Sequence, residues 1–490
     1  MQKKGNFNLK ITFFRKPNYF SKSYICGMNQ QDTICALATA NGVGAIGIIR
    51  VSGDNSINIT NTIFKGKDLT KVDSHTLHYG FIVQGEEVID EVMISIFKAP
   101  KSFTTEDSVE ISFHGSPFIG KRILDLLIAN GCRMAKAGEF SMRAFLNGRI
   151  DLSQAESIAD LIASESEAAR KVALNQLKGG ISNEISILRN DLLNFTSLIE
   201  LELDFAEEDV EFADRTELTQ LLQKLKSKLG GLLESFQYGN AVKNGVQVAI
   251  IGKPNAGKST LLNALLKEER AIVSDIAGTT RDTIEEVLHI GGHAFRFIDT
   301  AGIRDTADRV ESIGVEKAKE KINTADILLY LFDIKDSTPN EIINFITSLE
   351  RPDLKVILLQ NKIDSSNETE INDFWKQLKE VLVPNFTQTI LGISAKEEKN
   401  IEILKNELVS YIEELKTSES TIITNQRHQE ALQKSLLSVQ KVEEAITNRI
   451  STELLAYELR AAMEYLGEIS GEFTNDEVLG NIFGKFCIGK

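Results

Sequence analysis

An apolar run, Val246–Ile251, is followed at once by the segment Gly252–Thr260, with the letters GKPNAGKST. The second segment satisfies the pattern G-x-x-x-x-G-K-[ST], in which glycines let backbone N–H groups close around phosphate oxygens. Lys258 offers a positive charge to the β and γ phosphates, and the Ser259 hydroxyl suits Mg²⁺. Apolar residues after Thr260 predict the helix that such a loop precedes, within an α/β domain. The predicted nucleotide contacts here are Asn255, Ala256, Gly257, Lys258, Ser259 and Thr260.

Two further segments are expected to complete the phosphate and metal site. Asp299–Gly302 follows the apolar run Phe295–Ile298, which places a carboxylate at a strand end near the metal and a glycine beside the γ phosphate. Earlier in the chain, a hydroxyl of Thr279 or Thr280 can ligate Mg²⁺ and order a switch loop while the γ phosphate is present. The expected roles are Mg²⁺ ligation by Ser259 and Thr280, catalysis by Lys258 and Asp299, and nucleotide contact by Ser274, Asp275, Ile276, Ala277, Gly278, Thr279, Thr280, Asp299, Thr300, Ala301 and Gly302.

Two loops later in the chain carry residues suited to a guanine base. Asn361–Asp364, with the letters NKID, follows the apolar run Val356–Leu359, and an aspartate offers two acceptor oxygens to the N1–H and exocyclic amine of guanine. Adenine lacks that pair of donors, so this segment favours GTP over ATP. Ser394–Lys396 follows Leu391–Ile393 and resembles the last guanine-contacting loop of GTPases. The predicted guanine contacts are Asn361, Lys362, Asp364, Ser394, Ala395 and Lys396.

The residue after Gly302 is Ile303, where many small GTPases carry the glutamine that positions the attacking water. Another group must do that work, and two candidates stand out. Asn255, with oxygens from the loop 274–279, resembles GTPases that seat a K⁺ ion against the phosphates. Glu311 can orient water as a carboxylate, although its position also fits an acid that stabilises the first turn of a helix.

The length and charge of the chain limit the classes of protein to consider. At 490 residues it exceeds what one core usually organises, so we expect about three domains. The formal net charge is -15, so any nucleic acid must meet a local basic patch. The four cysteines show no C-x-x-C pair and no zinc-like spacing, which fits a reducing compartment such as the cytoplasm. No apolar run is long enough to span a bilayer, so membrane insertion is not expected.

The first 27 residues hold six Lys or Arg and no Asp or Glu. A transit peptide favours Arg and Ser over Lys, and a secretory signal needs a longer apolar run than Ile11–Phe14. An over-extended start, with folding from about Met28, is the third interpretation. We favour it because regular patterning begins at Thr33.

The rest of the chain shows three kinds of residue pattern, which indicate three kinds of structure. Residues 33–115 alternate short β-rich runs with turn residues, which is typical of an α+β domain. From about Asp151, and again over Glu402–Leu466, apolar residues recur at helical spacing, so two helical segments flank the α/β stretch. We expect the α/β domain to be inserted into one helical domain, and the alternative makes the helical segments separate domains. The predicted limits are an extra segment 1–27, an N-terminal domain 28–147, a helical domain 148–241 and 409–490, and a nucleotide domain 242–408.

Several motifs together resemble one family. Gly278–Asp282 (GTTRD), Asp299–Arg304 (DTAGIR) and Glu311–Gly314 (ESIG) resemble the MnmE (TrmE) family of tRNA modification GTPases. Related ribosome-assembly GTPases share parts of that core but not the ends of the chain. The C-terminal Gly471–Thr474 and Phe486–Lys490 are similar to that family's terminal signature. The N-terminal motifs Gly47–Arg50, Ser102–Thr104, His114–Gly115 and Gly138–Asn147 extend the resemblance over about Asp32 to Lys490.

The resemblance implies both a fold and a function. The fold would be multi-domain, with an α+β N-terminal folate-binding and dimerisation domain, an all-α helical domain and an inserted Ras-like P-loop GTPase domain. The protein would be a homodimeric, K⁺-dependent cytoplasmic GTPase that adds a carboxymethylaminomethyl group to carbon 5 of the wobble uridine of certain tRNAs. The carbon would come from 5-formyl- or methylene-tetrahydrofolate, and a flavin-bearing partner, MnmG (GidA), would share the work. We expect no FAD site in this chain, since no G-x-G-x-x-G lies between a strand and a helix.

The same resemblance implies which residues form the sites. Arg50, Glu110 and Arg149, with Lys490 nearby, would bind the folate. A carboxylate takes two donors from a pterin edge, and Arg or Lys suits the folate carboxylates. The resemblance also makes Glu311 the water-orienting residue. The implied K⁺ ligands are Asn255, Ser274, Ile276 through its carbonyl, and Thr279.

The chain departs from the family at a few positions near the expected folate site. Arg149 stands where relatives often have Lys, which keeps the charge but changes the geometry. Thr105 and Ser116 stand where relatives often have glycine, so the local loop shape can differ. Cys487 lies near the folate site in the family, yet a lone Cys between Phe486 and Ile488 is usually a buried small hydrophobe.

Two other functions stay open at the level of sequence. A ribosome-assembly GTPase switch would share the GTPase core, but its flanks should be basic RNA-binding modules, and neither flank here is net basic. A structural scaffold with a vestigial nucleotide site would tolerate loss of Lys258 or Asp299, and both are present. Folate binding separates the modification enzyme from the ribosome-assembly switch.

Overall fold

The structure is a computed structural model that describes most of the chain. By residue contacts the chain divides into two compact units, one of Met1–Ile150 with Thr474–Lys490 and the other of Asp151–Phe473. Over the described residues, no helix is long and apolar enough to cross a membrane. The described residues are 32–204, 215–267, 286–298, 322–349, 351, 353–381, 388–417, 419–448, 450–474 and 476–489.

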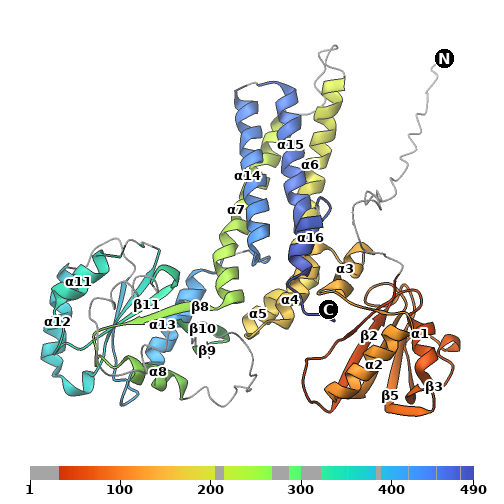
Figure 1. Ribbon diagram of the computed structural model, residues 1–490. Helices are drawn as coiled ribbons and strands as arrows, with labels where there is room; N and C mark the ends of the chain where they lie inside the picture. Colours follow the sequence, from red (N-terminus) through yellow and green to blue (C-terminus); the bar gives the residue numbers. More distant parts are fainter. Residues whose placement is uncertain are drawn as a thin grey trace, which may run out of the picture. The chain divides into compact units, whose positions relative to one another are not determined.

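The first unit is built on a mixed seven-stranded sheet with the order β3-β4-β5-β6-β2-β1-β7 (Figure 1). Neighbouring strands are antiparallel except β1 and β7, which run parallel. The register between β2 and β6 places Arg50 directly opposite Glu110. The strands are β1 (Ile34–Leu37), β2 (Ile46–Ser52), β3 (Phe64–Gly66), β4 (Thr76–Gln84), β5 (Glu87–Phe97), β6 (Ser108–His114) and β7 (Arg133–Met134).

One face of this sheet forms a core with two helices, and its other face carries exposed side chains. Because strand residues alternate between the two faces, Ile49 and Ile111 lie in the core with residues of α1 and α2. On the opposite face the side chains of Leu77, Tyr79 and Met93 are exposed. The helices of this unit before residue 150 are α1 (Ser56–Ile63), α2 (Pro117–Ala129) and α3 (Glu139–Leu146).

The C-terminal segment belongs to this first unit, where α16 (Asp476–Phe483) packs against α3. The ring centroids of Phe145 and Phe483 are 6.3 Å apart. The backbone N–H of Gly138 donates to the carbonyl of Cys487 at 3.4 Å. Gly138 has a φ of 63°, and a Cβ there would lie 2.6 Å from the Phe483 carbonyl oxygen. Glycine is therefore required where the C-terminal segment passes the start of α3.

The second unit contains a six-stranded sheet with the order β13-β12-β11-β8-β10-β9, in which the edge strand β9 is antiparallel to its neighbour and the other pairs are parallel. Alternate residues of β11 enter two different cores: Leu329 packs with α8 and α13, and Leu328 with α11 and α12. Helices on both faces are typical of parallel sheets. The elements are β8 (Val246–Ile251), β9 (Glu286–Ile290), β10 (His293–Ile298), β11 (Ile327–Phe332), β12 (Lys355–Gln360), β13 (Gln388–Gly392), α8 (Lys258–Leu266), α11 (Pro339–Thr347), α12 (Glu368–Val381) and α13 (Ile401–Glu414).

Long helices from both sides of the nucleotide domain share one core. Leu188 of α6 and Leu225 of α7 belong to the same buried cluster as Leu432 of α14 and Leu459 of α15. Figure 1 shows these four helices side by side. The α/β domain is therefore inserted into a single helical domain, as the sequence predicts, and the predicted fold class is confirmed. The domain limits given above stay predictions. The helices are α4 (Leu152–Ile162), α5 (Glu167–Leu177), α6 (Gly180–Asp204), α7 (Arg215–Asn244), α14 (Gln426–Thr447) and α15 (Thr452–Ser470).

Candidate functional site

The predicted phosphate loop lies between β8 and α8. A Cβ on Gly252 would lie 2.1 Å from the Leu331 carbonyl oxygen, so only glycine lets the chain leave β8 this close to β11. Asn255 and Gly257 have φ values of 63° and 101°. Left-handed residues in such a loop form concave backbone turns of the kind that bind anions. The loop therefore has the backbone shape that a polyphosphate requires.

The residues predicted to act on the phosphates follow directly in the first turn of α8. Lys258 begins the helix, and its Nζ donates to the carbonyl oxygens of Gly252 and Lys253 at 2.7 and 3.0 Å. Ser259 and Thr260 come next in the same turn. The helix N-terminus carries a partial positive charge, which adds to the charge of the Lys258 ammonium. This end of α8 is thus suited to a nucleotide's phosphates.

Asn361 joins the phosphate loop to both predicted guanine-contacting segments. Its side-chain amide donates to the Ala256 carbonyl at 2.8 Å, and its Oδ1 accepts from the Ala395 backbone N–H at 3.0 Å. The side chain is buried. A Cβ on Gly257 would lie 2.2 Å from Asn361 Nδ2, so this contact also depends on glycine in the loop. Segments far apart in sequence are therefore held in one fixed arrangement.

Asp364 is held as a carboxylate beside Ser394. A hydrogen bond with the Ser394 side chain lowers the pKa of Asp364 below its ordinary value, and the charge of Lys396 acts in the same direction. Lys362 adopts a left-handed backbone conformation, and its Nζ lies 3.1 Å from Asp333 Oδ2. An ionised Asp364 presents two acceptors, which matches the two donors on the guanine edge.

Part of the predicted nucleotide site lies outside the described residues. This applies to the loop 274–280, to Asp299–Gly302, and to Glu311. Thr280 as a Mg²⁺ ligand and three of the four implied K⁺ ligands therefore have no structural description, and they stay predictions. β10 ends at Ile298, directly before Asp299.

A second candidate site is a cavity of about 580 Å³ in the first unit. Three of the four residues that the family resemblance implies for folate line it: Arg50, Glu110 and Arg149. Arg50 donates from Nε and Nη2 to Glu110 Oε1 at 3.0 and 2.8 Å, and both side chains are partly exposed. The fourth residue, Lys490, lies outside the described residues.

An aromatic residue to which sequence analysis assigned no role lies at the centre of this cavity wall. The guanidinium carbons of Arg50 and Arg149 each lie 5.3 Å from the Phe103 ring centroid. Arg149 also donates to the Ser102 carbonyl. Asn147 lines the same cavity. Phe103 and Asn147 each lie within a motif shared with the family, but a single aromatic or amide side chain has no period or spacing that would mark it as functional.

Three further residues were singled out near this cavity: Thr105 and Ser116, which stand where relatives often have glycine, and Cys487. Thr105 lines the cavity with a φ of 64°, which is the backbone region that glycine adopts without strain. Ser116 is the N-cap residue of α2. Cys487 is an exposed free thiol, so its interpretation as a buried hydrophobe is wrong. Its neighbour Ile488 forms an isolated bridge with Ala137, and the Ile488 side chain is exposed as well.

Comparison with known proteins decides the family. Residues 33–149 match the family model described as GTP-binding protein TrmE N-terminus, and residues 152–487 match the model described as MnmE helical domain. The chain belongs to the MnmE family. The alternatives of a ribosome-assembly switch and of a vestigial scaffold are thereby set aside. As a member of the MnmE family, the chain is a GTPase.

Curated relatives agree with this membership over nearly the whole chain. The tRNA modification GTPase MnmE of Flavobacterium psychrophilum is 52% identical over 472 residues, which cover 94% of this chain and 100% of the relative. That of Bacteroides fragilis is 50% identical, with the same coverage. Among solved structures, Aquifex aeolicus Era bound to GDP and aluminium fluoride is 29% identical over 39% of this chain and 66% of its own, with a TM-score of 0.27.

Proposed function

We propose that this chain is a K⁺-dependent GTPase that acts with the flavin-bearing MnmG in modifying carbon 5 of the wobble uridine of certain tRNAs. The one-carbon unit would come from 5-formyl- or methylene-tetrahydrofolate held in the cavity of the first unit. The observation that carries the proposal is that Arg50, Glu110 and Arg149 line one cavity in the same chain as a P-loop. A GTPase that only switched between states would need no such second cavity.

The cavity has the chemistry that a folate requires. Glu110 presents a carboxylate to which two neighbouring N–H donors of a pterin edge can bind. Arg149 and Lys101 line the same cavity and suit the carboxylates of the glutamate part. Phe103 adds an aromatic side chain to the same wall, where its ring holds the guanidinium groups of Arg50 and Arg149. When bound, tetrahydrofolate supplies the one-carbon unit, while these residues bind and orient it.

In the nucleotide domain, the described residues would account for nucleotide binding. They do not include the residue that would orient the attacking water. Lys258 and the start of α8 would neutralise the β and γ phosphates, and Asp364 would select guanine. We assign orientation of the attacking water to Glu311. K⁺ is assigned to Asn255, whose left-handed backbone at the loop fits a ligand that faces the phosphates.

A homodimer is part of the proposal, and the open face of the first sheet supports it. Leu77, Tyr79 and Met93 are exposed there, and Ile46 is exposed on β2. Every second side chain of a strand points to the same face of the sheet. Ile46 and Arg50 are four residues apart on β2, so both point to that open face. A second copy that covered this face would therefore border the cavity. We place the complex in the cytoplasm, with tRNA contacts confined to local basic surface because the net charge is -15.

Folate binding tests the proposal. Isothermal calorimetry with 5-formyl-tetrahydrofolate should show uptake by the full chain and loss of uptake in Glu110→Ala. Glu86→Ala, in the exposed turn between β4 and β5, is the matched control and should bind as the wild type does. No uptake by the wild type, or unchanged uptake by Glu110→Ala, would remove the folate assignment.

A further inference from the structure

We propose that Arg143 and Glu106 are positioning residues for the folate cavity, although neither lines it. Arg143, on α3, donates two hydrogen bonds to the carboxylate of Glu106. Glu106 in turn holds the loop 99–107 in place, and this loop contributes Ser102, Phe103 and Thr105 to the cavity wall. The inference rests on the proposed folate site and extends it to a buried network behind that wall. This network would set the shape of the proposed folate site.

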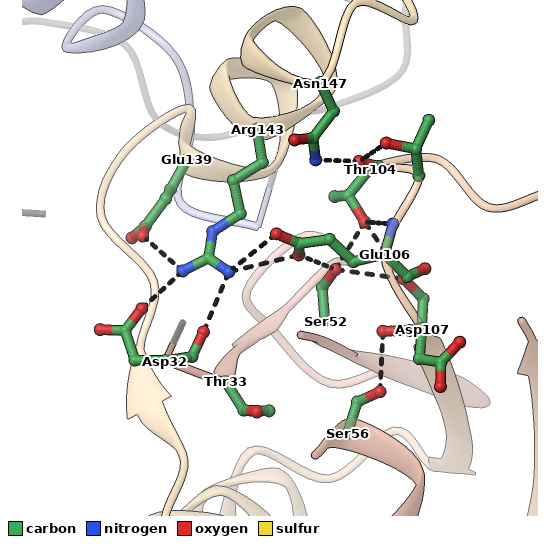
Figure 2. A network of polar contacts seen from close by, with 12 residues as sticks. Asp32, Thr33, Ser52, Ser56, Thr104, Glu106, Asp107, Glu139, Arg143 and Asn147 are labelled. Atoms are coloured by element: carbon green, nitrogen blue, oxygen red, sulfur yellow. Dashed lines mark hydrogen bonds and ion pairs between the residues drawn. The ribbon is translucent and has the colours of Figure 1, made fainter. Parts of the chain in front are cut away.

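The guanidinium of Arg143 lies between the carboxylates of Asp32 and Glu139 on one side and that of Glu106 on the other, as Figure 2 shows. On one side, Nη2 donates to Asp32 Oδ1 at 2.8 Å and to Glu139 Oε1 at 3.2 Å. On the other side, Nη1 donates to both carboxylate oxygens of Glu106 at 3.2 Å. The Arg143 side chain is only 7% exposed, so these bonds form with little screening by water.

Glu106 passes this restraint to the loop through several bonds. Its Oε2 accepts from the Ser52 hydroxyl at 2.8 Å, and Ser52 in turn lies 2.6 Å from Thr104 Oγ1. The carbonyl of Glu106 accepts from the Ser102 hydroxyl at 2.5 Å. Ser52 and Thr104 have no exposed surface. The loop segment beside Phe103 is therefore fixed to β2 and to α3 together.

α3 holds the same loop at a second point. The side-chain amide of Asn147 donates to the Thr104 carbonyl at 2.7 Å. Arg143 and Asn147 are four residues apart, which places both on one face of the helix end. In Figure 2 the two side chains reach the loop from the same helix. A shift of α3 would therefore move both supports of the loop at once.

The backbone at Thr105 explains why the loop needs this support. Thr105 is β-branched and has a φ of 64°, a region that costs about 1–2 kcal/mol for residues other than glycine. Such a conformation persists only where its surroundings hold it. Without Arg143, Glu106 would keep a largely covered carboxylate, 15% exposed, with fewer donors, and the loop would be free to relax. Phe103 would then leave its place between Arg50 and Arg149.

Arg133 provides a matched control for the test. It bonds the same carboxylates, Asp32 and Glu139, yet in the described part of the chain it makes no bond to the loop 99–107. Arg143→Gln and Arg133→Gln therefore each remove one guanidinium from the same cluster, and only the first releases Glu106. Calorimetry on the full chain gives the Kd of 5-formyl-tetrahydrofolate, and Tm and GDP affinity are measured alongside.

Arg143→Gln should weaken folate binding at least about tenfold, and so should Glu106→Gln. Because both act through one contact, the double variant should lose no more than about twofold beyond the worse single variant. Arg133→Gln should lower Tm but keep Kd within about twofold of wild type. GDP affinity should be unchanged in all of them.

Equal loss of folate binding in Arg143→Gln and Arg133→Gln would overturn the inference, because the effect would then follow stability. Wild-type binding in Arg143→Gln would overturn it as well. If Arg143→Gln does not fold, Glu106→Gln breaks the same contact from the other side and decides the matter. Failure of the wild type to bind the folate would instead refute the proposed function.

Discussion

The side-chain amide of Asn361 donates to the backbone carbonyl of Ala256 at 2.8 Å, and this bond joins base recognition to the phosphate loop. The same side chain accepts from the Ala395 backbone N–H at 3.0 Å. Three segments of the nucleotide site therefore depend on one buried amide. If these segments bind the nucleotide as predicted, they are already arranged for it, which would reduce the loss of conformational freedom on binding.

Replacing Asn361 should loosen this arrangement. In Asn361→Ala the Ala256 carbonyl and the Ala395 N–H lose their partners, at a cost of roughly 1–3 kcal/mol for each buried unsatisfied group. We expect GDP and GTP affinity to fall by at least about tenfold. Titration with a fluorescent guanine nucleotide measures this. Asn344→Ala, exposed on α11, should bind normally, and an equal loss there would contradict the explanation.

Asp364 should determine the choice of base. Asp364→Asn replaces one acceptor by a donor, so it can no longer receive both N–H groups of guanine, whereas xanthine offers a carbonyl at that position. We expect weakened GTP binding and improved binding of xanthosine triphosphate, a reversal of preference worth about 1–3 kcal/mol per mismatched hydrogen bond. Competition between the two triphosphates measures the ratio. An Asp364→Asn chain that still prefers GTP would show that Asp364 does not read the base.

The K⁺ assignment gives a prediction about salts. Wild-type GTP turnover should be at least about tenfold faster in K⁺ than in Na⁺ at equal ionic strength, because the ion replaces an arginine finger. Asn255→Gly removes the side-chain oxygen but permits the φ of 63°, so it should lose K⁺ stimulation while it still binds GDP. Equal wild-type rates in both salts would remove Asn255 from this role.

In the helical domain, Glu156 should make stability depend on pH. Burial works to raise the pKa of Glu156, but His428 and Arg427 outweigh burial and hold that pKa at about 2. The closest approaches to Glu156 Oε2 are 2.8 Å from His428 and 2.9 Å from Arg427. Since the folded pKa is below the ordinary value of 4.5, the ionised carboxylate stabilises the fold above about pH 4.5, and this is lost as the pH falls toward 2.

Glu156→Gln should therefore lower stability at neutral pH by roughly 3–5 kcal/mol, the cost of breaking a buried ion pair. Its difference from wild type should shrink as the pH falls below about 4.5. Thermal unfolding across that range measures both effects. Glu167→Gln is the control: Arg170 also lowers the pKa of Glu167 to about 2, but the pair is exposed and its loss should barely change Tm. A pH-independent Tm difference for Glu156→Gln would contradict this account.

The parts of the fold with strong local patterns could be predicted from sequence. The apolar runs Val246–Ile251 and Ile327–Phe332 coincide with β8 and β11, because strands buried on both faces are continuous apolar runs. The insertion of the α/β domain into the helical domain could be predicted because amphipathic helices lie on both sides of the α/β stretch. Their apolar faces pack against one another in one core. The guanine and phosphate contacts stay predictions, and what the structure shows is that Lys258 begins α8 directly after the loop that follows β8 and that Asn361 contacts both Ala256 and Ala395.

The wall of the proposed folate cavity could not be predicted in the same way. Arg143 reaches Asp32 across 111 positions of sequence, and Glu106 across 37. Neither separation has a period or a motif that marks it. Arg50 and Glu110 were expected at one site only from the family resemblance, and the register of β2 and β6 sets them opposite each other. Contacts of this kind depend on tertiary packing, and a single sequence carries no direct signal of it.

Nucleoside analysis of tRNA shows whether this chain takes part in wobble-uridine modification. Cells that lack this chain should lose the carbon-5 modification of the wobble uridine. The wild-type chain should restore it, whereas Lys258→Ala and Glu110→Ala, which remove the phosphate contact and the folate contact, should not. Unmodified wobble uridine in all cells except those with the wild-type chain would agree with the account. A full level of modification without the chain, or restoration by both variants, would contradict it.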